Sequence, residues 1–433
     1  MTVASSLAQH AVGLRQMVPP AATDDAIVDW FGVAIGGSST VSARAIASGM
    51  LPLTGASRVV GTHERAAPSV AALINGTAAH ALELDDIYAP GLFHPGAPTI
   101  AAALALADQR GSSMPDFRTA VMVGYEVGCR VARDLGPAHY AHWHTTGTAG
   151  SIGAAAAAAT LLGLAAEPFS HALSLAATMS AGLQQTFRSD AMGKPLHSGN
   201  AAQAGVIAAL AAAGGVTGAP DVFEGDAGLA AATGAPTSWT HSTAPFDAPL
   251  AIQQVTVKPF PCCGHTFAAI EAALRLRADG IDVAEIRSVE VRTYATAISV
   301  AGIRLPSTPL ERRFSIPFVV ARALADGRIA DDSFGTSTDA VDSVMPRIAM
   351  IVDNQFEAQF PDRRGAQLTV ATSGKRYEAT VPDRPGSPQN PLGPGGIDTK
   401  FGHAVAPILD RRADDALSRL RGGTSMVDEL VVV

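Results

Sequence analysis

The first half of the chain carries its apolar residues in helix-length segments that Gly and Pro interrupt. Thr23 suits the N-cap of a helix over 24–35, because acids occupy the first turn and Gly36-Gly37 follow the end. The same pattern predicts helices over 68–82, 99–110, 114–135, 150–164, 167–183 and 199–213. Since no clear alternating strand pattern occurs before about residue 250, we expect an all-helical domain.

The pattern changes near Pro249. Residues 251–257 and 286–294 alternate apolar and polar positions, as half-buried strands do. Residues 366–371 and 376–381 flank Thr372–Lys375, which predicts a β-hairpin. Helices are predicted between these strands, over 266–277 and 316–324. This part of the chain is therefore expected to be α+β.

The last segment returns to the helical pattern. Residues 382–394 have the composition of a linker, and 398–420 are predicted to form a helix that packs back on the first domain. The predicted architecture is multidomain. A large all-α helical domain spans 1–250 and 396–433, and a smaller α+β domain spans 251–395.

Composition narrows the class of protein. The 433 residues are 47% hydrophobic, 16% charged and 5% aromatic, which suits a large, alanine-rich helical core. The net charge is −8, whereas proteins that bind nucleic acids usually carry a basic surface, so no nucleic-acid partner is expected. The three cysteines do not form a disulfide framework, which favours a cytoplasmic location. The most apolar stretches, 151–166 and 201–215, are too short for a membrane span, so no membrane partner is expected.

Two stretches rich in His carry candidate chemistry. The first runs from His80 through Glu83, Asp85 and Asp86 to His94, at a predicted helix end that leads into a Pro/Gly loop. It fits either a proton-transfer or substrate-orienting cluster, or a helix end with solvated acids and a packing histidine.

The second stretch holds His139, Tyr140, His142 and His144, followed by Thr146 and a Gly-rich helix start. A helix N-terminus attracts anions, so this stretch can bind a carboxylate beside a catalytic histidine. A metal site is an alternative, although the H-x-x-H-x-H spacing matches no usual zinc motif. A structural role is the third possibility.

Two further stretches contain the rare lysines. The chain has four, Lys194, Lys258, Lys375 and Lys400, among 31 basic residues, and Lys may persist where a compact ammonium is needed. Lys194 lies between Arg188 and His197, before an Ala-rich helix. Lys258 precedes Cys262, Cys263 and His265 at the predicted domain boundary, where ligand clefts are common. The vicinal cysteines are also compatible with two buried thiols behind a turn.

The ordered set of these stretches resembles the MmgE/PrpD family. The matching segments include INGTAAHALELDD, HPGAPTIAAALALA, HWHTTGTAGSIGAAAAAA, MGKPLHSGNAAQAGVIAALAA and VKPFPCCGHTFAAIEA. Known members include 2-methylcitrate dehydratase, cis-aconitate decarboxylase and iminodisuccinate epimerase. The resemblance implies a helical domain plus an α+β domain, a homodimer, an active site between the domains, no obligatory cofactor and a small polycarboxylate substrate.

The resemblance also assigns residues. The expected catalytic residues are His94, His144, Lys194, Lys258, Asp85 and Tyr140. The expected substrate-binding residues are Glu83, Asp86, Thr146, Arg188, His197, Cys263 and His265, and no metal ligand is expected. Glu83 and Ile87 stand where the decarboxylase and dehydratase have an acid and a threonine, and Phe318 stands where some members have tyrosine. These departures leave the particular substrate open.

The sequence leaves five functions to be tested. The leading hypothesis is a cofactor-independent dehydratase that acts alpha or beta to a carboxylate of a small di- or tricarboxylate. The alternatives in the same family are a two-base epimerase or isomerase and a decarboxylase of a cis-aconitate-like acid. A metal-dependent hydrolase using His139, His142 and His144, and a non-catalytic carboxylate-binding protein, are the alternatives from other classes.

Overall fold

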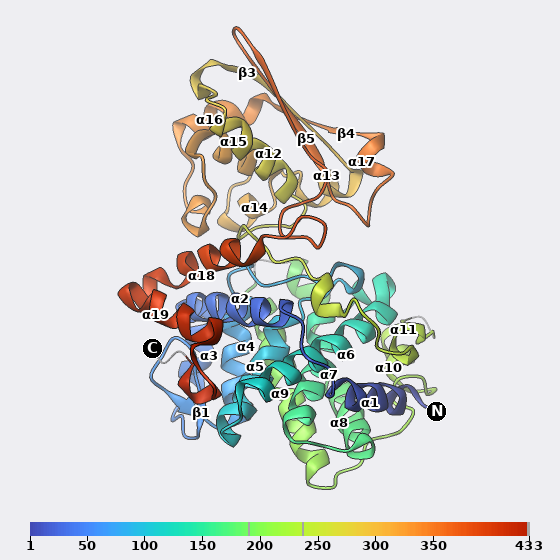
Figure 1. The fold of residues 1–433 in the computed structure, drawn as a ribbon. Coiled ribbons are helices and arrows are strands. Elements are labelled where there is room, and N and C mark those ends of the chain that lie inside the picture. The colour runs from blue at the N-terminus through green and yellow to red at the C-terminus, as the bar shows by residue number, and fades with distance from the viewer. Residues whose placement is uncertain (189–190, 236–237, 431–433) are drawn as a thin grey trace. The chain divides into compact units, whose positions relative to one another are not determined.

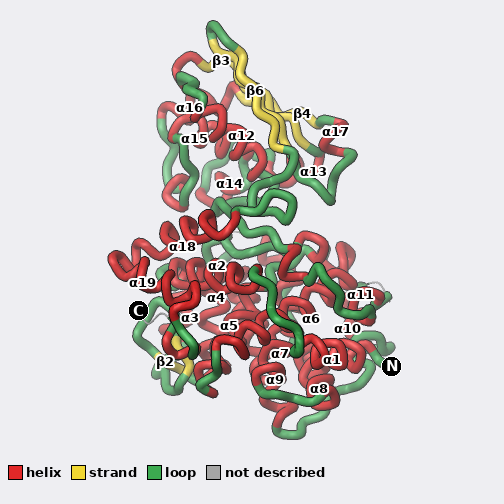
Figure 2. The backbone as a smooth tube through the Cα atoms, viewed as in Figure 1, coloured by secondary structure: helices red, strands yellow, loops and turns green. Residues whose placement is uncertain are grey.

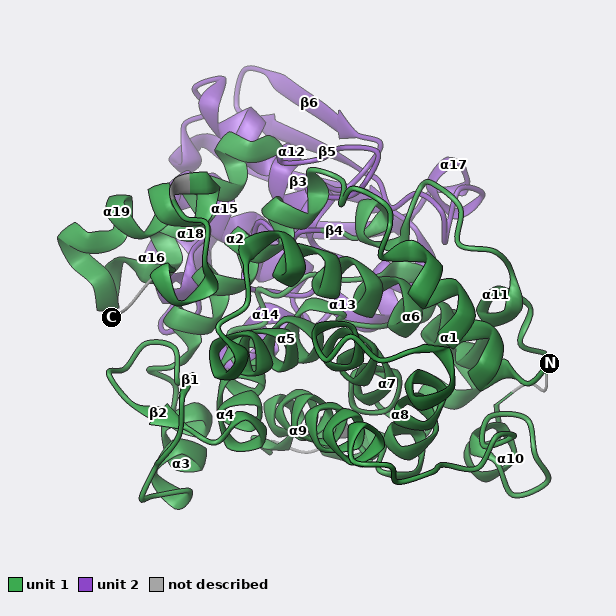
Figure 3. Cartoon of the chain, turned by 60° about the horizontal axis from the view of Figure 1, so that its bottom comes forward, with its two compact units in different colours: residues 1–256, 393–433 green, residues 257–392 purple. Residues whose placement is uncertain are grey.

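The chain divides into two compact units, shown in green and purple in Figure 3. The computed structural model describes residues 1–188, 191–235 and 238–430. Unit 1 comprises Met1–Thr256 with Gly393–Val433, and unit 2 comprises Val257–Leu392. The sequence placed the two boundaries after residues 250 and 395, and the structure divides the chain after 256 and 392.

Unit 1 is helical, as the Gly/Pro-punctuated apolar pattern predicted (Figure 1). Its longer helices are α1 (Val3–Leu14), α2 (Ala22–Gly37), α3 (Val41–Gly49), α4 (Pro68–His80), α5 (Gly96–Arg110), α6 (Met114–Tyr140), α7 (Thr145–Leu161), α8 (Ala166–Thr178), α9 (Gly193–Ala213) and α18 (Gly393–Leu409). Short segments complete it: β1 (Ser57–Arg58), β2 (Arg65–Ala66), α10 (Leu229–Thr233), α11 (Thr240–Thr243) and α19 (Ala413–Ser418). Among the described residues, no helix is both long enough and apolar enough to cross a membrane.

Helix α7 lies in the core of unit 1. Every residue from Thr145 to Ala159 is buried, so the helix has no solvent-facing side over that length. It packs against α5, α6, α8 and α9. Small residues make this possible, because a Cβ atom at Gly205 of α9 would lie 2.5 Å from the Ala154 Cβ atom. Alanine and glycine thus bring helix backbones close together, and with them the side chains at the helix ends.

Unit 2 combines one sheet with helices (Figure 2). The strand order is β4 (Ile348–Val352), β3 (Ile286–Thr293), β5 (Ala366–Thr372) and β6 (Arg376–Val381). Strands β3 and β4 are parallel, whereas β3–β5 and β5–β6 are antiparallel. Helices α12 (Phe267–Ala278) and α15 (Ile316–Asp326) share a hydrophobic core with the sheet. The remaining helices are α13 (Ala295–Ala301), α14 (Pro309–Arg313), α16 (Asp339–Val344) and α17 (Asn354–Glu357).

One predicted strand is absent, and three short strands were not predicted. Residues 251–257 do not form a strand: Ala251–Gln254 is a 3₁₀ turn, and the Thr256 backbone makes only an isolated bridge with Ile87. The turn closes because the Glu126 carboxylate accepts from the Ala251 N–H at 2.7 Å, a contact from a residue distant in sequence. The prediction that 398–420 is helical and packs on the first domain is confirmed, although α18 already begins at Gly393 and a 3₁₀ turn over Asp410–Arg412 separates it from α19. Strands β1, β2 and β4 were not predicted, because they are short and do not alternate clearly.

The close approach of α7 and α9 predicts a stability difference between two glycine substitutions. Gly205→Ala places a methyl group against the Ala154 side chain and 2.6 Å from the Ala155 backbone nitrogen, so it should destabilise unit 1 by about 1–3 kcal/mol. Gly13→Ala is the control, because this exposed helical glycine has open space around it and should change stability by less than about 1 kcal/mol, in the favourable direction. Urea unfolding measures both, and equal midpoints would contradict the packing argument.

Candidate active site

Residues from three helix ends and one loop meet in unit 1. His80 is the last residue of α4, and the loop after it carries Glu83, Asp85, Asp86 and His94. His144 is the N-cap of α7, and Lys194 and His197 lie at the start of α9. These segments are far apart in sequence and are joined here by the packing of the small-residue helices.

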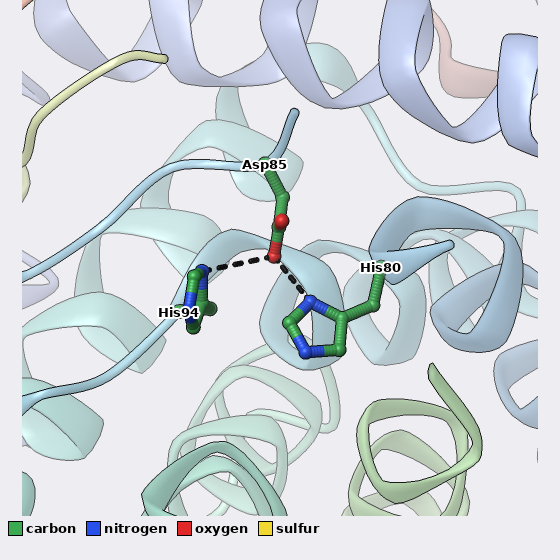
Figure 4. Close-up of side chains that lie close together, drawn as sticks. All are labelled: His80, Asp85 and His94. Carbon is green, nitrogen blue, oxygen red and sulfur yellow. Dashed lines mark hydrogen bonds and ion pairs between the residues drawn. The ribbon is translucent and has the colours of Figure 1, made fainter. Parts of the chain in front are cut away.

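The Asp85 carboxylate is the centre of the cluster, and Figure 4 shows the two imidazoles that point at it. His80 Nδ1 lies 2.5 Å from Asp85 Oδ2, and His94 Nδ1 lies 3.2 Å from the same oxygen. His94 Nδ1 also lies 2.9 Å from the Asp86 carbonyl oxygen. A ring nitrogen that faces two oxygens is the protonated one, so Nε2 is the basic nitrogen of His94.

His144 packs on this group from the start of α7. Its ring stacks on His80 with centroids 5.4 Å apart and an interplanar angle of 19°, and Phe187 meets it edge-on at 4.9 Å. His144 Nδ1 lies 3.2 Å from His197 Nδ1, so one of the two rings carries a proton there. Burial, followed by the neighbouring charges of His80 and Lys194, holds the pKa of His144 well below its usual value. His144 is therefore a neutral imidazole at pH 7.

Lys194 brings a positive charge to the edge of the cluster. Its ammonium pairs with the Glu83 carboxylate and lies 5.6 Å from the centre of the Phe187 ring. Both charged side chains are partly exposed, at 18% for Lys194 and 23% for Glu83. Glu83 has a φ of 57°, which is a left-handed conformation uncommon for a residue with a side chain. This backbone conformation directs the turn that carries Asp85 inward.

Asp86 faces the interior instead. The Gly96 N–H donates to one carboxylate oxygen at 3.0 Å, and the Tyr125 hydroxyl donates to the other at 2.8 Å. Burial raises the pKa of Asp86 to about 7, and these two hydrogen bonds oppose the rise. Such bonding favours a role for Asp86 in holding the loop against α5 and α6. Thr146 lies beside the same loop, where its Oγ1 accepts from the His94 N–H at 3.3 Å.

The structure brings most of the predicted unit 1 residues together: His94, His144, Lys194, Asp85, Glu83, Asp86, Thr146 and His197. Tyr140 is half-buried at the end of α6, and the side chain of Arg188 lies outside the described residues. The assignment left out His80 and Phe187, although His80 stood in the first His-rich stretch. Its spacing of five residues from Asp85 was the available signal.

Three predicted site residues, Lys258, Cys263 and His265, belong to unit 2. Lys258 is 2% exposed, and the Cys263 N–H donates to the Arg313 carbonyl oxygen at 3.0 Å. His265 Nδ1 lies 2.7 Å from the Tyr294 hydroxyl oxygen, and burial together with two arginines lowers the His265 pKa to about 3. Burial raises the pKa of the Cys262 thiol to about 12, which makes it unsuited to act as a thiolate nucleophile. A role for Lys258, Cys263 and His265 beside the unit 1 cluster stays a prediction.

Metal binding by His139, His142 and His144 is not supported. His139 Nε2 is bonded to Thr148 Oγ1 at 2.8 Å, His142 is exposed, and His144 belongs to the Asp85 cluster. Among the described residues, the atoms of His80, Asp85 and His94 that can bind a metal lie within 4.8 Å of one another. Hydrogen bonds between these same atoms account for their closeness.

Two family models and several known proteins match this chain. The MmgE/PrpD N-terminal domain matches residues 6–242, and the MmgE/PrpD C-terminal domain matches residues 260–421. A cis-aconitate decarboxylase-like protein of Aspergillus oryzae is 26% identical over 69% of this chain and 68% of its own length. The cis-aconitate decarboxylase of Homo sapiens is 30% identical over 62% of this chain and 58% of its own length. An alkylcitrate dehydratase of Talaromyces stipitatus is 30% identical over 28% of each chain.

The fold and the cluster together indicate the class of protein. It is a two-domain enzyme with a helical unit, which carries the His/Asp/Lys cluster, and an α+β unit. The two domain matches cover nearly the whole chain, so the protein belongs to the MmgE/PrpD family of enzymes. The fold class inferred from the sequence resemblance is thereby confirmed.

The raised pKa of Asp86 predicts a pH dependence of stability. Between about pH 4 and about pH 7 the folded protein keeps the Asp86 proton, whereas the unfolded chain has lost it. The free energy of unfolding should therefore fall as the pH rises through this window, by up to about 1.4 kcal/mol per pH unit. Asp86→Asn should lack this component, and urea unfolding at several pH values measures the difference. Parallel profiles for the two proteins would contradict the assignment.

Proposed function

We propose that this protein is a lyase that breaks a bond alpha or beta to a carboxylate of a small di- or tricarboxylic acid, with dehydration as the leading reaction. The observation that carries the proposal is the meeting of neutral His144, Asp85-bound His94 and the Lys194 ammonium in one cluster. The names of the relatives support the class, since one is a decarboxylase and another a dehydratase of carboxylic acids.

The chemical problem explains these residue types. Removing a proton alpha to a carboxylate places negative charge on the carboxylate oxygens. Lys194 and the N-terminus of α7, which begins at Thr145, are suited to stabilise that charge. The pair between Lys194 and Glu83 supplies a carboxylate partner that a substrate carboxylate can replace.

The two histidines suit different steps. His144 is kept neutral by burial, so it is the better general base. His94 is bound through Nδ1 to Asp85, whose negative charge stabilises an imidazolium, so it is the better general acid for a leaving hydroxyl. Positioned proton transfer of this kind is worth about 10²–10⁴-fold in rate.

A decarboxylase of a cis-aconitate-like acid is the second candidate, and the names of several relatives favour it. An epimerase that uses the two imidazoles on opposite faces of one carbon is the third. The three reactions differ in what leaves the substrate: water, carbon dioxide or nothing. Incubation of citrate-like, aconitate-like and amino-dicarboxylate compounds in deuterated water separates them by water loss, gas release and deuterium exchange. A binding protein without turnover would show thermal stabilisation alone.

The role of the cluster predicts the effect of substitutions. His144→Ala and Lys194→Ala should each lower kcat/KM by on the order of 10²-fold or more, because base and charge stabilisation are removed. His142→Ala is the matched control, since this exposed histidine lies two residues from His144 and outside the cluster. Steady-state kinetics on the best substrate measures all three, with circular dichroism to confirm folding. Full activity in both cluster variants would end the role assignment.

The proposal requires neither a metal nor an organic cofactor. It retains a homodimer as an expectation of the family and a cytoplasmic location as an expectation from the cysteine content. Purified protein should keep its activity after chelation, and its mass by light scattering should be twice that of one chain. A stoichiometric metal that is lost in His80→Ala would instead identify His80, Asp85 and His94 as its ligands.

A further inference from the structure

Lys400 connects the end of the chain to the loop of the candidate site. It lies on α18, which packs against α2 within unit 1. The two helices approach closely, because a Cβ atom at Gly36 of α2 would lie 2.7 Å from the Ala404 carbonyl oxygen of α18. A side chain from α18 can therefore reach past α2 to the segment that follows α4.

The ammonium group of Lys400 is buried, with 8% of the residue exposed. It lies 2.5 Å from Asp29 Oδ1 on α2 and donates to the Leu84 carbonyl oxygen at 2.7 Å. A buried ammonium is costly unless it is paired and hydrogen-bonded, and this one has both kinds of partner. Lys400 is also one of the four lysines in an arginine-rich chain, where a compact point charge suits a narrow site.

The Leu84 carbonyl is the point at which this bond acts on the site. The carbonyl of Leu84 and the N–H of Asp85 belong to one planar peptide unit, so fixing the first also fixes the second. Glu83, on the other side of Leu84, adopts a left-handed conformation, with a φ of 57°. The hydrogen bond from Lys400 to Leu84, called here the Leu84 tether, therefore holds the loop in place. In that position the left-handed turn at Glu83 presents the Asp85 carboxylate to His80 and His94.

The surroundings of Asp29 explain why a cation is needed at this place. Asp29, Asp85 and Asp86 line one small cavity of about 10 Å³, which is the room for about one water molecule. Burial raises the pKa of Asp29, and the Lys400 charge opposes that rise. Without the ammonium, three carboxyl groups would share a buried space with no cation to favour their ionised forms, and the Leu84 carbonyl would lose its donor.

We propose that Lys400 is a positioning residue that sets the Asp85–His80–His94 geometry through its bonds to Leu84 and Asp29. The inference rests on the proposed function for its kinetic readout, because only a working site shows the effect on turnover. Lys400 does not contact the imidazoles directly: it bonds the Leu84 carbonyl, and the next residue, Asp85, bonds the two rings. It therefore touches no reacting atom.

The test compares Lys400→Met with Lys375→Met. Lys375 is an exposed lysine of the β5–β6 hairpin in unit 2, so its loss should leave kcat and KM unchanged. Lys400→Met should lower kcat by on the order of 10²-fold, the size typical of a reacting group displaced by about 1 Å. KM should change much less, because Lys194 and the α7 N-terminus remain in place.

A second variant separates positioning from stability. Lys400→Met leaves the Asp29 carboxylate buried without its cation and should lower the melting temperature. The double variant Asp29→Asn/Lys400→Met removes both charges and should recover the melting temperature while kcat stays low, because the Leu84 tether is still missing. Wild-type kcat in the double variant would overturn the proposal and leave Lys400 with a stabilising role alone.

A structural readout keeps the two proposals distinguishable. In protein labelled with ¹⁵N-histidine, the proton of the His80–Asp85 hydrogen bond should give a low-field resonance that disappears in His80→Gln. We expect the same resonance to shift or broaden in the double variant and to stay unchanged in Lys375→Met. If wild-type protein turns over no acid in the panel, the proposed function fails while this resonance still tests the positioning. An unchanged resonance in the double variant would overturn the positioning.

Discussion

The buried carboxylate of Asp85 is the group on which the site depends. A carboxyl group at 4% exposure needs close polar partners, and two imidazoles supply them through one oxygen. Because both partners must reach this oxygen, His80 and His94 each turn the Nδ1 atom of the ring toward Asp85. It also makes the loop from Glu83 to His94 the part of unit 1 that must be held most accurately, since it carries the acid and one of its partners.

Small side chains create the space in which this requirement can be met. His80, His144 and His197 come from the ends of α4, α7 and α9, and three such ends can converge only if the helix axes lie close together. Gly199 of α9 illustrates the packing, because a Cβ atom there would lie 2.3 Å from the Leu73 carbonyl oxygen of α4. The alanine-rich composition is therefore a condition for the site as well as for the fold.

Burial also determines the charges in the cluster. It keeps His144 and His197 neutral, since the pKa of each is lowered first by desolvation and then by its neighbours. The positive charge comes from Lys194, which stays half-buried and is balanced by Glu83. A carboxylate substrate would thus meet a partly exposed ion pair at the edge and uncharged bases inside, an arrangement suited to binding an anion before moving a proton.

The sequence by itself determined the two-part architecture, because apolar periodicity and Gly/Pro punctuation are local properties that most of α1 to α9 and the β5–β6 hairpin express directly. It also marked the stretches that supply the site. Spacing alone did not separate His139 from His144, and only the family resemblance singled out His144. In the structure His139 bonds Thr148 in the core, whereas His144 stacks on His80. The strand expected over 251–257 failed for a similar reason, since the Glu126 contact is non-local. Only tertiary packing decides which side chains share a space, because it joins residues such as Lys400 and Leu84 that no local pattern relates.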